Sequence, residues 1–243
     1  MTFTTESGHT VGLYVPSYKR WNKLHEKKLL DNMYVTYVVR ESEKQHYEGE
    51  NVNCIAVEDS KINSLGKVRQ WIIDNAKEDV VIQIDDDVKK LCYCLKENYI
   101  VIEDSETIIN ELVRISQILI DLKLGMASLT MTADVRKHIS EFLWKGIIGG
   151  INWYNRSAVK GKYEGELIKV DTDFVLQELL HNRIIIVPDY MGMVSEHDRN
   201  AGGNNTSKTY ERLVNDNNYL KLKWGKNYDF DYKKNQSKVV VKR

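Results

Sequence analysis

Proline and cysteine are scarce in this chain of 243 residues. With two prolines and no low-complexity segment or repeat, the sequence offers no linker between domains, and we expect a single domain. The three cysteines, Cys54, Cys92 and Cys94, are an odd number without the second spaced pair of a zinc site, which argues against a disulfide framework and a zinc centre. We therefore expect a protein of a reducing cytosol, with Cys92 and Cys94 as structural residues on one face of a strand or turn.

Long apolar runs and a net charge are absent as well. No run approaches the roughly 20 apolar residues of a membrane-spanning helix, and the N-terminal MTFTTESGHT lacks the basic and apolar regions of a signal peptide. The 35 Lys and Arg residues equal the 35 Asp and Glu residues, so no overall field indicates a polyanionic partner. Basic residues do gather at 19–28 and 219–243, where they either attract phosphates or form ordinary solvated surface.

The sequence does contain an alternation of apolar strands and amphipathic helices, typical of an α/β protein with a mostly parallel sheet. Strands are predicted at 10–15, 33–39, 51–57, 80–84, 126–131, 147–154 and 183–187. Helices are predicted at 21–30, 65–76, 106–124, 171–180 and 206–223. We expect residues 10–100 to form a nucleotide-type half, 101–205 to complete the site, and 206–243 to form a C-terminal helix and basic tail.

The stretch VVIQIDDDV, residues 80–88, runs from a buried strand into three carboxylates. Asp85 and Asp87 can point to the same side of an extended backbone, with Asp86 on the other side toward a ribose hydroxyl or a backbone N–H. Mg²⁺ and Mn²⁺ are typically held by one or two carboxylates together with phosphate oxygens, and a bound ion offsets the repulsion among like charges. The triplet therefore predicts a metal–nucleotide site, with a plain turn as the alternative.

Other polar residues are expected near this triplet. Pro16, Ser17, Tyr18 and Arg20 follow the first predicted strand and Glu41 follows the second, and ligands of open parallel sheets bind beyond the carboxyl ends of the strands.

The helix that leads into the acidic strand opens with Lys67 and Arg69, where the helix dipole normally favours acidic residues. A helix N-terminus with basic side chains beside it can bind an anion, so we expect a diphosphate there, with ordinary surface charge as the alternative.

Five segments, taken in order, carry a resemblance to a known family: VPSYKR, LGKVRQWIIDNA, IQIDDDV, GGINWYNR and VDTDFVLQEL. Over roughly residues 10 to 200 the chain resembles nucleotide-sugar glycosyltransferases of the GT-A fold, in particular the inverting family 2 type. The resemblance implies a Rossmann-like, mostly parallel sheet flanked by helices in a single domain. It also implies transfer of a hexose or pentose from a nucleotide sugar, first of all a UDP-sugar, with Mn²⁺ or Mg²⁺.

The same resemblance implies roles for residues in the first half of the chain. The residues after the first two strands would hold the nucleobase, Arg69 would contact the nucleotide, and Asp85 and Asp87 would bind the metal.

In the second half, Asp171 or Asp173 would act as catalytic base, in a segment that reads Val-Asp-Thr-Asp where the family usually has Glu-Asp. A helix N-cap is the alternative for Asp171. His197 resembles a C-terminal histidine that completes the metal or diphosphate site, and the alternative is an exposed loop histidine.

The acceptor is predicted from a narrower resemblance. The segments VPSYKR and IDDDV, and the basic C-terminus with Trp224, Tyr228 and Tyr232, are similar to glycosyltransferases associated with TET-like base hydroxylases of phages. That similarity implies double-stranded DNA with hydroxymethylated pyrimidines as acceptor, in the cytoplasm of a host cell. The alternatives are a transferase for polysaccharide, lipid or protein, a nucleotidyltransferase, whose Gly-rich first loop is absent here, and a non-catalytic nucleotide- or DNA-binding module.

Overall fold

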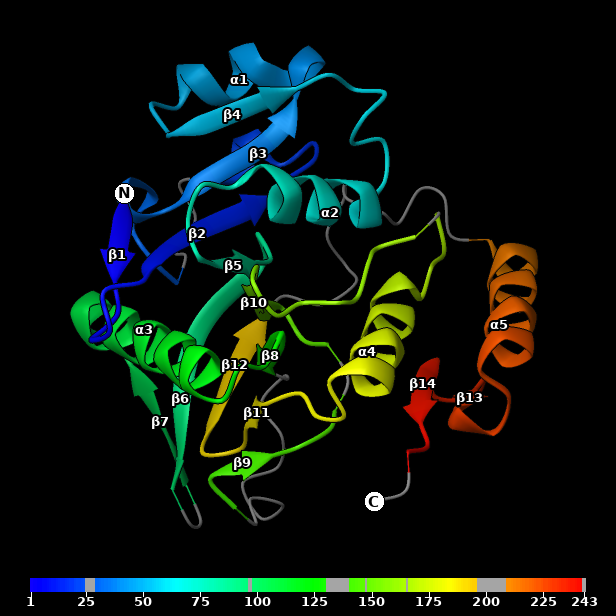
Figure 1. Ribbon diagram of the computed structural model, residues 1–243. Helices are drawn as coiled ribbons and strands as arrows, with labels where there is room; N and C mark the ends of the chain where they lie inside the picture. Colours follow the sequence, from blue (N-terminus) through cyan, green and yellow to red (C-terminus); the bar gives the residue numbers. More distant parts are fainter. Residues whose placement is uncertain are drawn as a thin grey trace.

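The computed structural model describes residues 1–24, 29–95, 98–129, 140–146, 148–164, 166–195 and 209–241. A seven-stranded sheet forms its centre, in the order β4-β3-β2-β5-β10-β8 with β1 paired beside β2 (Figure 1). The strands are β1 (Thr2–Thr4), β2 (Thr10–Pro16), β3 (Thr36–Arg40), β4 (Cys54–Val57), β5 (Val80–Ile84), β8 (Met126–Leu129) and β10 (Ile151–Asn155).

The sheet is mostly parallel. β4, β3, β2 and β5 are parallel neighbours, whereas β10 runs antiparallel to both β5 and β8. The carboxyl ends of β2, β3 and β5 therefore lie on the same edge, and β10 begins at that edge. This edge is where ligands bind in sheets of this kind.

Helices cover both faces of the sheet. The α-helices are α1 (Lys44–Gly49), α2 (Leu65–Asn75), α3 (Ser105–Asp121), α4 (Val170–His181) and α5 (Tyr210–Trp224). In Figure 1, α3 lies on one side of the sheet, and α2 and α4 lie on the other. Ile82 packs in the cluster that contains α3, while its neighbour Val81 packs in the cluster that contains α2 and α4. Both side chains are fully buried, and each such burial contributes about 1.5–3 kcal/mol.

Smaller sheets lie around this core. Their strands are β6 (Val88–Leu95) between β7 (Asn98–Ile102) and β12 (Met191–Ser195), β9 (Phe142–Leu143) with β11 (Val187–Pro188), and β13 (Tyr228–Asp231) with β14 (Gln236–Val239). Short 3-10 turns occur at Trp21–Lys23, Asn32–Tyr34, Glu41–Glu43 and Gly225–Asn227. α5 lies outside α4, where Leu220 packs with Leu176, Tyr228 and Phe230 (Figure 1). No helix in the described parts of the chain is long and apolar enough to cross a membrane.

Most predicted elements are present. The strand at 80–84 is confirmed residue for residue, and the predicted helix at 65–76 follows Ser64, whose side chain accepts a hydrogen bond from the backbone N–H of Lys67. The helices predicted at 106–124, 171–180 and 206–223 are present with shifted ends. Cys92 and Cys94 are buried free thiols on β6, as expected.

Two predicted elements are wrong. In the described part of the segment 21–30 there is only the 3-10 turn, and Leu29 and Leu30 lie outside any helix although they are buried. Leu29 and Leu30 pack in the main core cluster, so their burial does not require a helix. The strand predicted at 183–187 is reduced to Val187 in β11, with Ile186 forming an isolated bridge to Ala127.

Candidate functional site

The acidic triplet lies at the ligand edge of the sheet, directly after β5. The backbone N–H of Asp85 donates to the carbonyl of Gly150 over 2.7 Å, and the carbonyl of Asp85 accepts from Val88, which turns the chain into β6. Gly150 has no room for a side chain, because a Cβ there would lie 2.8 Å from Cγ2 of Val88. The first residue of the triplet is therefore fixed by the strand ladder on one side and by a tight turn on the other.

A buried arginine connects the triplet to helix α4. Arg69, on α2, is 1% exposed, and its Nη2 donates to Asp85 over 2.8 Å. Its Nη1 lies 3.6 Å from Oδ1 of Asp171 in the first turn of α4. Nε and Nη1 of Arg69 and Oδ1 of Asp171 are buried without a hydrogen-bond partner in the described structure. Because buried donors of a cation normally have partners, these nitrogens fit an anionic ligand.

The carboxylates repel one another when no cation is bound. Burial raises the pKa of Asp85 to about 7, Asp87, Asp171 and Asp86 add to the shift, and Arg69 opposes it. Within the described residues, no group of three or more His, Cys, Asp and Glu side chains is arranged to hold a metal ion. One or two carboxylates with diphosphate oxygens suffice for Mg²⁺ or Mn²⁺, so Asp85 and Asp87 fit an ion that arrives with a nucleotide.

Both carboxylate oxygens of Asp86 bind residues of the loop that follows β2. It accepts a hydrogen bond from Oγ of Ser17 over 2.9 Å and pairs with Arg20 through its other oxygen. Ser17 Oγ is also 2.8 Å from the hydroxyl of the buried Tyr47. Both oxygens of Asp86 are thus engaged within the protein, and the residue ties the loop after β2 to the end of β5. Asp87 is more exposed, with 25% of its side chain accessible, and lies 4.0 Å from Nη1 of Arg20.

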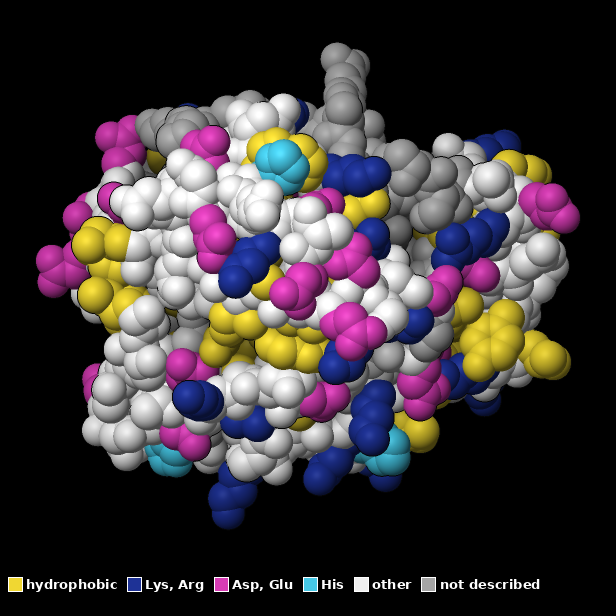
Figure 2. Space-filling view, turned by 90° about the horizontal axis from the view of Figure 1, so that it is seen from above, with side chains coloured by type: hydrophobic (Ala, Val, Ile, Leu, Met, Phe, Trp, Pro, Cys, Tyr) yellow, Lys and Arg dark blue, Asp and Glu magenta, His cyan; other side chains and the backbone are white. Residues whose placement is uncertain are grey.

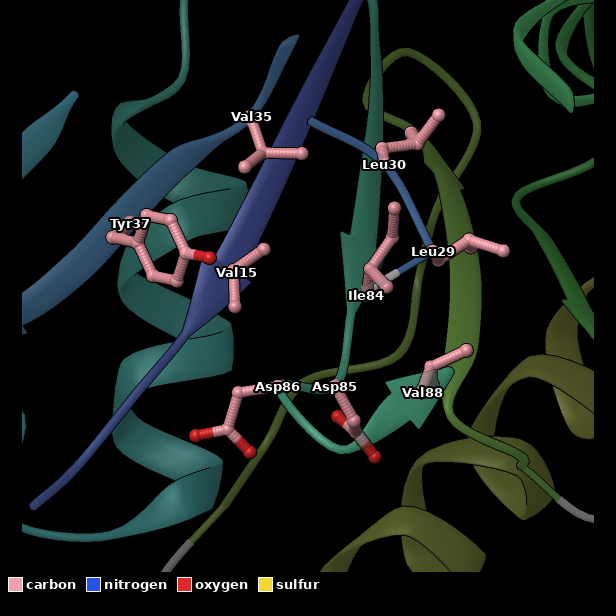
Figure 3. A pocket seen from close by; sticks show the side chains of 9 residues that line it. All are labelled: Val15, Leu29, Leu30, Val35, Tyr37, Ile84, Asp85, Asp86 and Val88. Carbon is pink, nitrogen blue, oxygen red and sulfur yellow. The ribbon is translucent and has the colours of Figure 1, made fainter. Parts of the chain in front are cut away.

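A small cavity lies beside the first two carboxylates (Figure 3). Its volume is about 20 Å³, which holds about one water molecule and no nucleotide. In Figure 3 the carboxylates of Asp85 and Asp86 extend to the side away from Val35 and Leu30. The apolar residues at the end of β5 thus lie on the inner side of the carboxylates. A ligand would approach the carboxylates from the opposite side, at the edge of the sheet.

The other site residues predicted after β2 and β3 lie on or near the same edge of the sheet, and their surroundings differ from one residue to the next. Pro16 is the last residue of β2 and is buried. The ring of Tyr18 has the guanidinium of Arg40 at 3.9 Å, a cation–π contact. Glu41 is exposed in the 3-10 turn after β3. The acidic residue that contacts the first loop is Glu43, which is buried and accepts from the backbone N–H of Lys19 over 3.1 Å.

Glu43 was not predicted, because a charged residue two positions into a turn gives no sequence signal of burial. Burial raises the pKa of its carboxyl group. Lys67 pairs with Glu166 over 3.1 Å and is 37% exposed, so in the structure it contacts the segment before α4 rather than the acidic triplet.

Asp171 and Asp173 have opposite environments although both lie in the first turn of α4. Asp171 faces Arg69, whereas Asp173 is fully buried and accepts hydrogen bonds from Gln177, Lys223 and Trp224. The N-cap of α4 is Lys169, so the alternative that Asp171 is the cap residue is wrong. His197 lies outside the described residues.

Two of the C-terminal aromatic side chains, Trp224 and Tyr228, make contacts within the protein. Trp224 donates to Asp173, and Tyr228 is 1% exposed, so the Tyr228 side chain is not accessible to a nucleic acid. Tyr232 is 47% exposed. Lys221 and Lys238 pair with Asp229 and Asp231, which reduces the positive charge of this region.

Comparisons with known proteins identify the fold. No family model and no curated protein sequence matches the chain. Among solved structures, glucosyl-3-phosphoglycerate synthase of M. tuberculosis aligns with a TM-score of 0.55 and 10% identity over 97% of this chain and 89% of its own. The same enzyme has been solved with Mn²⁺, UDP and glucosyl-3-phosphoglycerate, at a TM-score of 0.54 and 9% identity over 97% and 88% of the two chains.

Two further matches are more distant. S. aureus TarS (residues 1–349) aligns with a TM-score of 0.46 and 12% identity over 75% of this chain. A mannosyltransferase from Pyrobaculum calidifontis in complex with GDP-Man and Mn²⁺ aligns with a TM-score of 0.46 and 16% identity over 73%. The chain spans 59% and 54% of their respective lengths. The mixed sheet flanked by helices, aligned over nearly the full length of the synthase, has the GT-A glycosyltransferase fold.

Proposed function

We propose that this protein is a metal-dependent glycosyltransferase that moves a sugar from a nucleotide sugar to a hydroxyl acceptor. The observation that carries the proposal is the bridge formed by Arg69 between Asp85, at the end of β5, and Asp171, at the start of α4. It brings together the carboxylate that we propose as a metal ligand, a guanidinium whose Nε and Nη1 have no hydrogen-bond partner, and a second carboxylate. The similar synthase of known structure holds Mn²⁺ and UDP.

The donor would bind along the edge formed by β2, β3 and β5. Asp85 and Asp87 would hold Mn²⁺ or Mg²⁺, which neutralises charge on the leaving diphosphate when bound. Arg69 would contact the diphosphate through the nitrogens that lack partners. Pro16, Tyr18 and Glu41 would surround the nucleobase, for which we propose the uracil of a UDP-sugar.

The loop after β2 would contact the donor. Ser17, Arg20 and Asp86 would hold that loop in place. Lys67 would balance charge at the start of α2, where it pairs with Glu166.

Asp171 is the proposed general base, and the reaction would invert the anomeric centre. The acceptor oxygen forms a bond to the anomeric carbon while the bond from that carbon to the diphosphate oxygen breaks. The acceptor proton moves to Asp171, and the electron pair of the broken bond stays on the nucleoside diphosphate. Asp171 suits this role because 29% of its side chain is accessible, whereas Asp173 is fully buried and enclosed by three donors.

Two acceptor classes remain proposals. A hydroxymethylated pyrimidine in DNA is supported by the exposed Tyr232 and the basic residues beside it. A neutral hydroxyl acceptor, such as a saccharide, is the other class; the groove of about 550 Å³ between the segment before α4 and α5 lies on the Asp173 side of α4 and not beside Asp171. Its lining includes Glu164, Glu166 and Asp216, which repel phosphates. On the face in Figure 2, acidic and basic side chains are interspersed rather than grouped by sign.

The test is release of nucleoside diphosphate or monophosphate from UDP-, GDP- and CMP-sugars in the presence of Mn²⁺. Each donor is assayed with hydroxymethylated duplex DNA, with unmodified duplex, with a panel of saccharides, and alone. We expect metal-dependent release that one acceptor class stimulates, and loss of donor binding and turnover in Asp87→Asn. No metal-dependent release from any donor would overturn the proposal. Nucleotide binding that survives in Asp87→Asn without metal would identify a non-catalytic binding module.

A further inference from the structure

The buried carboxylate of Asp173 connects helix α4 to the C-terminal helix. Asp173 is 0% exposed. Its Oδ2 accepts from Nζ of Lys223 over 2.9 Å, and its Oδ1 accepts from Nε1 of Trp224 over 2.6 Å. A third donor, Gln177, comes from the next turn of α4 at 2.9 Å. A fully buried carboxylate is stable only when it is paired and hydrogen-bonded, so these contacts are strong constraints on the first turn of α4.

The C-terminal region also holds the residues that lead into this turn. Asp216, on α5, accepts from the backbone N–H of Ile168 over 2.7 Å, and Arg212 donates to the carbonyl of Glu166. The side chain of Lys169 donates to the carbonyl of Asn235 over 3.3 Å. The helix itself has no side-chain cap at Lys169. Residues 209–241 therefore help to fix the start of α4, which has no side-chain cap of its own.

Asp171 and Asp173 occupy opposite sides of one helical turn. Residues two apart on a helix are rotated by about 200°, so a contact on one side sets the direction of the other. Asp173 contacts α5 on the outer side, and Asp171 faces Arg69 at 3.6 Å on the inner side. Any rotation or shift of the first turn changes both contacts together.

We infer that Lys223 and Trp224, acting through Asp173, are positioning residues that hold the base Asp171 in the reactive site. This inference rests on the proposed function, in which Asp171 takes the acceptor proton. Misplacement of a reacting group by about 1 Å can lower a rate by about 100-fold. Lys223 and Trp224 thereby contribute to catalysis through α4.

The experiment compares Trp224→Phe and Lys223→Met with two control variants of the full chain. Lys223→Arg keeps the ion pair with Asp173, and Lys221→Met removes a lysine of the same helix that pairs with the half-exposed Asp229 and donates to the carbonyl of Tyr228, away from Asp173. We expect the first two variants to lower kcat by about 10- to 100-fold while the KM for the donor and the Kd for UDP–Mn²⁺ change less than about 2-fold. Lys223→Arg and Lys221→Met should keep the parental kcat.

The outcomes separate the two proposals. Parental kcat in a folded Trp224→Phe and Lys223→Met would overturn the positioning role, as would a loss of UDP–Mn²⁺ affinity that accounts for the whole loss of rate. Circular dichroism and thermal unfolding establish folding, and if Trp224→Phe does not fold, Lys223→Met with its Lys223→Arg rescue decides the question. Absence of metal-dependent turnover in the parent protein would overturn the proposed function and, with it, the catalytic meaning of the contact.

Discussion

Oδ1 of Asp171 lies 3.6 Å from Nη1 of Arg69, while the other terminal nitrogen of the same guanidinium binds Asp85. One buried cation therefore joins two carboxylates that lie 86 positions apart in the sequence. Coulombic attraction to these carboxylates outweighs the desolvation of Arg69 and raises its pKa, so it stays charged. The two halves of the site depend on this one side chain.

Replacing Arg69 by Met should lower the free energy of unfolding by about 3–5 kcal/mol, because Asp85 and Asp171 would lose their shared counter-charge. Urea unfolding of the metal-free protein measures the change. Lys67→Met is the matched control, since its pair with Glu166 is exposed and should contribute about 0–1 kcal/mol. Equal losses in the two variants would contradict the bridging role.

Replacing Asp85 by Asn should stabilise the metal-free protein at pH 8. The pKa of Asp85 is raised to about 7, above the roughly 3.9 of an unfolded chain, so the folded state retains a proton between about pH 4 and 7 that the unfolded state has lost. Stability therefore falls as pH rises through this window, and the Asn variant lacks that fall. Melting temperatures from pH 5 to 8 measure it.

The same variant has a second expected property. The parent should gain melting temperature when Mn²⁺ and UDP are added, because ligands that bind only the folded state stabilise it. Asp85→Asn should not gain. A parent whose metal-free stability is flat from pH 5 to 8 would count against the repulsion among these carboxylates.

Asp79 should give an acid-dependent contribution to stability. The backbone N–H and the hydroxyl of Thr10 donate to its carboxylate at 2.8 and 2.9 Å, and they hold the pKa of Asp79 below its usual value. Its contribution is present above about pH 4, the unfolded pKa, and is lost as pH falls through the lower folded value. Asp79→Asn should melt below the parent at pH 7, and the two curves should converge near pH 2. A constant difference would contradict this assignment.

Glu178 should be among the costliest positions to truncate. It is fully buried and accepts from the backbone N–H groups of Lys160 and Gly161 and from Asn182. Glu178→Ala would leave several buried donors without partners and should cost about 3 kcal/mol or more in urea unfolding. Glu48→Ala, which removes an exposed pair with Lys44, should cost less than about 0.5 kcal/mol. Comparable costs would show that the segment 160–161 is not held by Glu178.

The central elements could be predicted from the sequence because their patterns are local. Val80–Ile84 is apolar except for Gln83 and is buried on both faces, so its bounds could be predicted directly. α2 and α3 show helical periodicity and begin after capping residues, Ser64 and Asp104. The shared edge at the carboxyl ends of β2, β3 and β5 could be predicted from the order of strands and helices alone.

Other elements depend on distant partners. β6 contains Lys89 and Lys90, which interrupt the apolar alternation of a strand, and it pairs both with the next strand β7 and with β12, about a hundred residues later. α1 is six residues long and mostly polar. In the site, the sequence left Asp171 and Asp173 equivalent, because only the packing of α5 against one side of α4 separates their roles.

The hydrogen bond from Asp85 to Gly150 also determines which change elsewhere in the chain would move the acidic triplet. β10 begins at the next residue and is locked against β5 in the register Ile151 to Ile84. The backbone position of the acidic triplet therefore depends directly on Gly150 and on this register, so a change at either would move the carboxylates.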